Sequence, residues 1–246
     1  MGFFDFLSAE KRKEKKLDRE IKSANNKFKP KDYRQVSLQN VIEAARKGNP
    51  TAVAGLLARF TVVAEPTIED EKEKDWVFDA LVEMGDKVLP EIRKALRRHE
   101  SISWIQRVLR DIVSEDVYRA EMLSVLEEFD TEYERNPDRK LQTVMALAEI
   151  PDPSVVEALM RFLEDVDETV RYQTATALAD CGDESAREPL LRVMCEDESL
   201  RIRNMVVEAF ARLGWATAGY KKKVDSILPK GFIHDKSGKI VKLGNA

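Results

Sequence analysis

The sequence predicts an all-α protein: an α-solenoid of about six helix pairs, with a basic N-terminal helix and a short C-terminal tail. Three observations support this prediction. Residues 136–214 contain one pattern nearly three times. Glycine and proline are scarce, at 10 and 9 of 246 residues, so the summed preference is for helix. Apolar residues recur at spacings of three and four, which places them on one face of a helix.

The repeated pattern has a period of 31 and then 32 residues. Ala146, Ala177 and Ala209 fall in register, and each is followed by a large apolar residue. A fixed period of this length is typical of an array in which every unit is one helix pair. Because a single pair cannot bury its apolar faces alone, successive pairs must stack on one another.

Glycine, proline and short polar residues mark where the helices begin and end. Gly182 is expected to end a first helix in the left-handed conformation, and Asp183 to cap the second helix that follows. In the preceding unit, Asp152 is the expected cap and Pro153 the first helical residue. In the last unit, Lys221–Lys223 indicate a solvated terminal face, as the end of an array requires.

We divide the chain into a basic N-terminal segment at 1–35, the helical array at 36–228 and a tail at 229–246. Residues 64–73 are acidic and contain Pro66, so we expect a loop there. Within the tail, apolar pairs flank a DKSG turn, a pattern that is consistent with a small hairpin.

Two acidic residues, Asp165 and Asp197, each precede a Val-Arg or Ile-Arg pair that ends in Arg171 or Arg203. Together with the Ala-Leu or Ala-Phe run that closes each first helix, this pattern resembles HEAT repeats of the short bacterial kind related to phycobilisome-lyase repeats. The resemblance covers residues 136–214. It implies that these four charged residues form a structural ladder between neighbouring repeats. It specifies fold rather than function.

Charge is distributed unevenly along the chain. Residues 1–34 and residues 215–246 each carry a net charge of +5, whereas the whole chain carries −4, which leaves −14 for the middle. An acidic array is a poor clamp for nucleic acid, so we expect no nucleic-acid partner. A basic protein or peptide is the partner that this charge favours.

Paired charges recur on the expected second helices. In this fold the second helices line the concave surface, so we predict that these side chains contact a partner segment. The alternative is that such pairs only stabilise exposed helices, by about 0.2–0.5 kcal/mol each. The predicted partner-binding residues are Glu157 with Arg161, Glu188 with Arg192, and, less regularly, Glu91 and Arg98.

The sequence contains no recognisable catalytic, cofactor or metal-binding constellation. His99 and His234 lie far apart, and metal sites need clustered ligands. Cys181 and Cys195 occupy core-type helix positions, so we expect buried thiols that act as small apolar residues. There is no glycine-rich phosphate loop and no nucleophile motif. We therefore predict a protein that is not an enzyme and that needs no cofactor.

The N-terminus has two interpretations. Phe3, Phe4 and Phe6 precede a strongly basic helix, which could cover the open end of the first repeat or lie on a membrane surface. No apolar run of membrane-spanning length or signal peptide is present, so we expect a cytoplasmic, monomeric protein. The function predicted is a non-enzymatic interaction scaffold. The alternatives are a chromophore-lyase-like factor, suggested by the resemblance only, and a peripheral membrane adaptor.

Overall fold

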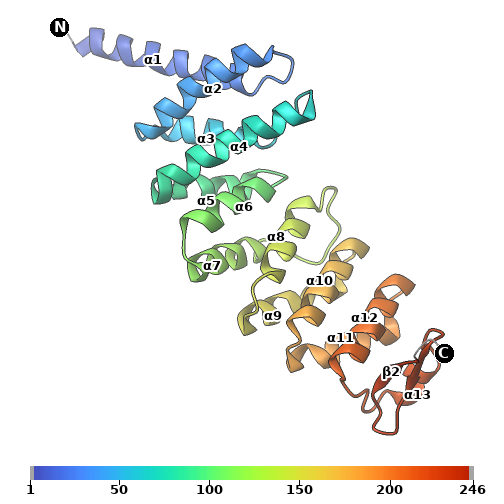
Figure 1. Cartoon of the computed structure of the whole chain (residues 1–246). Coiled ribbons are helices and arrows are strands. Elements are labelled where there is room, and N and C mark those ends of the chain that lie inside the picture. The colour runs from blue at the N-terminus through green and yellow to red at the C-terminus, as the bar shows by residue number, and fades with distance from the viewer. Residues whose placement is uncertain (1–2, 244–246) are drawn as a thin grey trace. The chain divides into compact units, whose positions relative to one another are not determined.

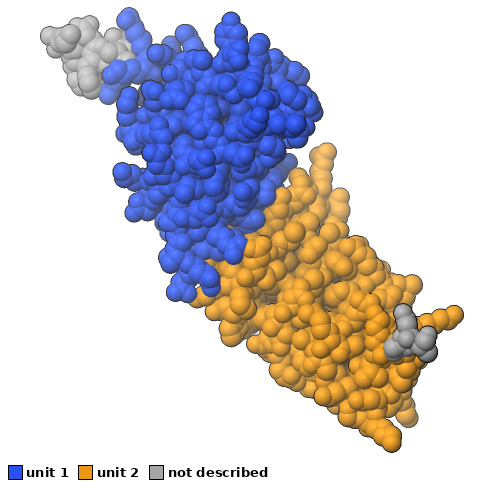
Figure 2. Space-filling model, viewed as in Figure 1, with its two compact units in different colours: residues 1–118 blue, residues 119–246 orange. Residues whose placement is uncertain are grey.

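The computed structural model describes residues 3–243, with side chains from Glu10 onwards. It is predominantly helical, as predicted, and forms two compact units (Figure 2), which we call unit 1 (Met1–Tyr118) and unit 2 (Arg119–Ala246). The aromatic residues Phe3, Phe4 and Phe6 lie on the first helix, but their side chains are outside the described part of the chain. Each unit is a stack of helix pairs (Figure 1).

Unit 1 is built from helices that alternate between two layers. Helices α2, α4 and α6 pack in succession as the first helices of each pair, while α3 and α5 pack on one another as second helices. The elements of unit 1 are α1 (Phe3–Ala24), α2 (Lys31–Arg46), α3 (Pro50–Arg59), α4 (Thr67–Met84), the 3-10 turn η1 (Gly85–Val88), α5 (Leu89–Arg98), α6 (Ser103–Ile112) and the start of α7 (Glu115–Leu126).

The C-terminal half of α1 packs on the first helix pair. It contacts both α2 and α3, and Ala24 is buried there. Gly55 of α3 permits this approach, because a Cβ at that position would lie 2.8 Å from Cγ1 of Ile21. The side chain of Asn25 adds a hydrogen bond by donating Nδ2 to the Gly55 carbonyl at 3.0 Å. The helix therefore covers one end of the stack in unit 1.

The prediction of a loop at residues 64–73 is wrong for residues 67–73, which are helical. Helix α4 begins at Thr67, directly after Pro66, and its first turn contains Glu69 and Asp70. Acidic residues in a first turn are favourable because they face the positive end of the helix dipole. Proline ends or precedes a helix more readily than it interrupts one. The acidic segment is thus the start of a helix, and two of its carboxylates, Asp70 and Glu73, are buried.

Unit 2 contains the well-formed repeats. Ala146, Ala177 and Ala209 are all buried at equivalent places in three first helices, as the register predicted. Helices α8, α10 and α12 pack in succession (Figure 1). The elements are α8 (Asp138–Ala148), α9 (Pro153–Met160), η2 (Arg161–Glu164), α10 (Glu168–Cys181), η3 (Glu184–Ala186), α11 (Arg187–Glu196), α12 (Leu200–Leu213), α13 (Lys221–Asp225), β1 (Phe232–His234) and β2 (Ile240–Lys242).

The predicted helix boundaries in unit 2 are confirmed. Gly182 ends α10 with φ of 68°, a left-handed conformation that a side chain would oppose. Asp152 and Asp183 accept backbone N–H groups as the caps of α9 and η3. The tail forms an antiparallel hairpin in which Ile233 pairs with Val241. Among the described residues, no helix is long and apolar enough to cross a membrane.

Candidate partner-binding groove

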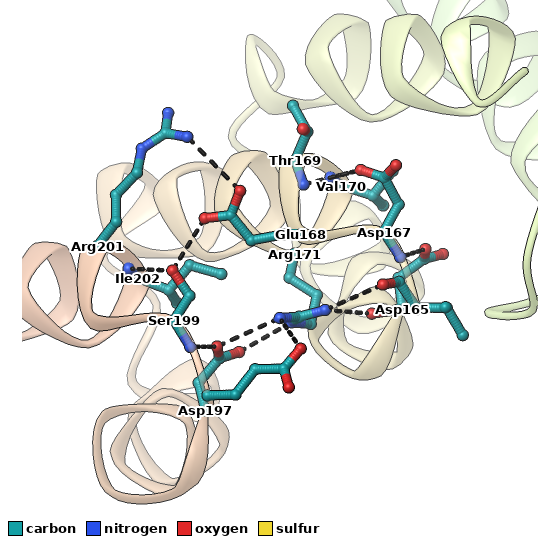
Figure 3. A network of polar contacts seen from close by, with 12 residues as sticks. Asp165, Asp167, Glu168, Thr169, Val170, Arg171, Asp197, Ser199, Arg201 and Ile202 are labelled. Atoms are coloured by element: carbon teal, nitrogen blue, oxygen red, sulfur yellow. Dashed lines mark hydrogen bonds and ion pairs between the residues drawn. The ribbon is translucent and has the colours of Figure 1, made fainter.

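Ion pairs link the first helices α8 and α10 of unit 2 to the junction with the repeat that follows each of them. Arg171 of α10 donates Nε to Oδ2 of Asp197 at 2.9 Å (Figure 3). One repeat earlier, Lys140 of α8 donates Nζ to Oδ2 of Asp165 at 2.8 Å. Asp165, Asp197 and Arg171 therefore take part in the expected ladder, with a lysine in place of an arginine on its first rung, but among the described residues no ion pair extends the ladder to Arg203. Arg203, the equivalent residue of α12, is half-buried.

The acids of the ladder also order the backbone at each repeat junction. Asp165 and Asp197 accept the N–H groups of Asp167 and Ser199, which are themselves the caps of α10 and α12 (Figure 3). The hydrogen bond to Asp197 raises the pKa of Arg171 above its usual range. Because each carboxylate binds both a cation and a backbone donor, the junctions are held in a repeating geometry.

A groove of 720 Å³ lies beside this ladder, and we call it the unit 2 groove. Its walls come from the end of α9 with η2, from α11, and from the junction that follows α11. Half-buried apolar side chains alternate there with charged ones. The lining residues are Met160, Arg161, Leu163, Glu164, Asp165, Arg171, Pro189, Arg192, Val193, Glu196, Asp197 and Glu198.

The exposed charges of the groove are of both signs. Arg192 pairs with Glu188 at 3.3 Å, as the spacing predicted, and this contact raises the pKa of Arg192. Glu196 accepts Nζ of Lys223 at 2.8 Å, which lowers the pKa of Glu196. The side chain of Glu198 is 88% exposed, although it also contacts Arg171. The groove therefore offers carboxylates and a guanidinium to a partner at the same time.

The structure brings together only part of the predicted row of charges. Arg161 lines the unit 2 groove with Arg192, but no ion pair joins it to Glu157 within the described residues. Its Nη2 donates to the Leu126 carbonyl at 2.9 Å, at the end of α7. Glu157 is exposed on α9.

Glu91 and Arg98 belong to unit 1, so they are not part of the unit 2 groove. Glu91 pairs with Lys94 at 2.7 Å on α5, and it lines a separate hollow of 240 Å³ with Arg46 and Glu83. Arg98 is exposed at the end of α5. These two residues of the predicted row of charges therefore lie on a different unit from the other four.

Sequence reasoning missed a group of buried charges in unit 1, which we call the buried ion cluster. It consists of two carboxylates and three cations, all at most 5% exposed, from Arg34, Arg59, Asp70, Glu73 and Lys74. Arg59 donates Nη2 to both carboxylates, at 2.5 Å to Asp70 and 2.9 Å to Glu73. Arg34 binds Glu73 with two further donors, at 3.0 and 3.2 Å. Burial alone would raise the pKa of Asp70, but hydrogen bonds from Lys74 and Arg59 outweigh it and lower the pKa.

A second hollow of unit 2, of 470 Å³, lies against α10, α12 and the hairpin. It is lined partly by Arg212, which pairs with Asp180 at 2.7 Å. This hollow and the unit 2 groove share no lining residue. Arg212 therefore provides an arginine of similar exposure to Arg192, outside the groove.

The two cysteines and the two histidines were the candidates for chemistry in the sequence. Cys195 is buried, which raises the pKa of its thiol, whereas Cys181 is only half-buried because it lies at the last turn of α10. The expectation of a buried thiol is thus wrong for Cys181. Burial lowers the pKa of His99, and His234 bonds to Asp225 and to Thr217 across the tail. The described residues include no group of three His, Cys, Asp or Glu side chains placed to hold a metal ion.

Comparison with protein families gives one match. The model for HEAT repeats matches residues 125–211, which run from the end of α7 to α12. This match, together with the stacked helix pairs, identifies residues 125–211 as HEAT repeats. Comparison with curated proteins found no match. HEAT repeats commonly act as protein-interaction scaffolds and are typically non-catalytic.

Proposed function

We propose that this HEAT-repeat protein is a non-enzymatic scaffold, and that its unit 2 groove holds a segment of a partner protein. The observation that supports the proposal is the composition of the groove. The exposed carboxylates of Glu164 and Glu198 and the exposed guanidinium of Arg192 line the same groove as half-buried Met160 and Val193. Interfaces combine apolar contact for affinity with placed charges for specificity in this way.

The charges define the chemistry of the partner segment. Among the groove residues, Asp165 pairs with Lys140 and Arg171 pairs with Asp197. The exposed charges are therefore the acids Glu164, Glu196 and Glu198 and the arginines Arg161 and Arg192. The exposed surface is thus slightly acidic and of mixed sign. We expect a segment that carries apolar side chains together with alternating charges, in which cations exceed anions.

The test compares two arginine reversals in the same unit. Arg192→Glu places a like charge opposite Glu188 and changes the groove, whereas Arg212→Glu breaks a comparable exposed pair outside it. Each full-length variant is used to capture partners from the source cells, with quantification by mass spectrometry. We expect wild type and Arg212→Glu to recover the same stoichiometric protein, and Arg192→Glu to lose it by at least about tenfold.

Two results would count against the proposal. Equal loss of the partner from both variants would show that any reversal of charge on unit 2 is enough to prevent binding. Full recovery by Arg192→Glu would show that the partner binds elsewhere. Circular dichroism and thermal unfolding establish that both variants fold, which is expected because both arginines are exposed and removal of a surface pair changes stability by about 0–1 kcal/mol.

A further inference from the structure

Helix α1 carries a one-sided set of cations, which we call the cationic face. In the linear sequence acidic residues interrupt these cations, but an α-helix turns about 100° per residue. On that geometry six of the seven described cations of α1 share an arc of about 140°, whereas Lys13 falls outside it with Glu10, Glu14, Asp18 and Glu20. The cationic face consists of Lys11, Arg12, Lys15, Lys16, Arg19 and Lys22, and all six side chains are exposed.

The end of the cationic face meets two projecting apolar side chains. Lys22 lines a shallow hollow of 470 Å³ together with Phe28 and Val63. Phe28 is 86% exposed and Val63 is 64% exposed, although both belong to residue types that folding normally buries. Phe28 lies in the turn between α1 and α2, and Val63 in the loop between α3 and α4. The apolar pair and the cations therefore form one continuous surface of unit 1.

The turn that carries Phe28 is ordered, so its projection is a feature of the fold. Asn26 accepts the backbone N–H of Phe28 at 3.0 Å, and Lys29 donates Nζ to Ser23 at 2.9 Å. Lys27 lies over the phenyl ring at 5.3 Å. Of the acids in the neighbouring loop and first turn, Glu69 is paired with Lys31 at 2.5 Å, and Glu65 is exposed. Cations thus predominate around the two apolar side chains.

We propose that this surface of unit 1 docks on an anionic lipid bilayer, with Phe28 and Val63 in the headgroup layer and the cationic face against lipid phosphates. Charge complementarity selects a polyanionic partner. The projecting ring of Phe28 favours a bilayer over the other polyanionic partners, which are an acidic protein or a nucleic-acid duplex. A fluid bilayer closes around an exposed phenyl ring and an adjacent isopropyl group, whereas a rigid protein would need a matching pocket. A nucleic-acid duplex gives Val63 no apolar surroundings.

The test measures sedimentation of the full-length chain with two kinds of vesicle. One kind is phosphatidylcholine alone, and the other contains equal parts of phosphatidylcholine and phosphatidylglycerol. We expect binding to the anionic vesicles only, and weaker binding at higher salt because exposed charges are screened. Residues 1–9 are unchanged in every variant, so any loss is assigned to the altered positions.

Two double variants separate the components of the surface. Lys15→Ala with Arg19→Ala should lower the partition coefficient about twenty-fivefold, since each cation near an anionic surface contributes about fivefold. Phe28→Ser with Val63→Ser leaves the charge unchanged and should lower it at least about tenfold. The matched control is Lys222→Ala with Lys230→Ala, two exposed lysines of unit 2, which should bind as wild type does. Thermal unfolding verifies that each variant is folded.

Three results would overturn the proposal. One is equal binding of wild type to neutral and anionic vesicles, or binding to neither. Another is unchanged partitioning of the Phe28→Ser, Val63→Ser variant. The third is tight binding of wild type to a nucleic-acid duplex that this variant retains in full, which would assign the cationic face to nucleic acid instead. Failure of the unit 2 groove test has no bearing on these results, because the two surfaces lie on different units.

Discussion

At the scale of single residues, we expect the buried ion cluster of unit 1 to be costly to disturb. Asp70 and Glu73 are each 1% exposed, and Arg59, which bonds to both, is fully buried. A buried charge that loses its partner costs about 3–5 kcal/mol, because neither water nor another ion replaces the contact. An exposed pair contributes about 0–1 kcal/mol. The cluster and the surface pairs of the same helices should therefore respond very differently to mutation.

The first prediction concerns Arg59. Arg59→Met should lower the free energy of unfolding by about 3–5 kcal/mol, because both carboxylates stay buried with fewer donors. Arg46→Met is the control, since Arg46 pairs with Glu83 at 2.5 Å while both side chains are exposed. That change should cost at most about 1 kcal/mol. Urea unfolding measures both, and similar small losses would contradict the account of the cluster.

The second prediction concerns pH. The pKa of Asp70 is lowered in the folded chain, so the unfolded chain binds a proton at higher pH than the folded one does. Asp70 therefore stabilises the fold above its unfolded pKa of about 3.9, and this stabilisation is lost as the pH falls through its folded pKa. In wild type, the free energy of unfolding should therefore decrease steeply as the pH is lowered below about 4.

Asp70→Asn removes the titrating group and tests the origin of that slope. The variant should be less stable than wild type at pH 7, yet it should lose less stability on acidification. Urea unfolding across the acid range gives both slopes. Parallel slopes for the two proteins would assign the acid sensitivity to other carboxylates.

These residues also show why the sequence predicts some positions and not others. The acidic run with Pro66 is typical of a loop, and nothing within it indicates burial. Its carboxylates are buried because Arg34 and Arg59 approach from helices that are up to 39 residues away in the sequence. Local patterns do not report such distant contacts. Cys181 differs for a local reason, since its helical spacing is right but α10 ends beside it.

At the scale of elements, the helix ends and the interrepeat contacts were the most predictable features. Caps such as Asp152 and the left-handed Gly182 act on their own neighbours, so the local sequence contains the whole cause. The ladder followed from the resemblance to HEAT repeats. Its first rung, Lys140, was not predicted, because the pattern specifies an arginine there. Spacing alone also predicted a pair for Arg161, whose guanidinium bonds to the Leu126 carbonyl.

The third prediction tests this first rung. Lys140→Met should lower the free energy of unfolding by about 3 kcal/mol, because Asp165 would be left fully buried without its cation. The control is Lys221→Met, which removes an exposed lysine paired with Asp225 at 2.9 Å and should cost at most about 1 kcal/mol. Equal effects in urea unfolding would show that the ladder does not stabilise unit 2.

The fourth prediction concerns the docking of α1. Gly55→Leu places a side chain where Ile21 already lies, so the local opening of α1 should become easier by about 1–3 kcal/mol. Hydrogen exchange of the amides at residues 21–24 should accelerate accordingly. Ala54→Leu is the control, because Ala54 is exposed on the same helix. Unchanged exchange in Gly55→Leu would show that α1 does not depend on this contact.

At the scale of the whole molecule, the sequence predicted stacked helix pairs, but not their division into two compact units. The periodicity of the sequence describes how each helix pair contacts its neighbour, but it does not indicate where contacts between successive pairs become fewer. For the same reason the predicted row of charges was treated as one surface, although Glu91 and Arg98 lie on unit 1. The binding role of the remaining four residues stays a prediction, supported by the groove that Arg161 and Arg192 share.

The central claim is that a partner segment occupies the unit 2 groove. Hydrogen–deuterium exchange of the full chain, with and without the partner that wild type recovers, tests it most directly. We expect protection concentrated at residues 161–164 and 189–198, with residues 205–212, which line the second hollow of unit 2, unchanged. Protection of residues 205–212 without protection of the groove would contradict it.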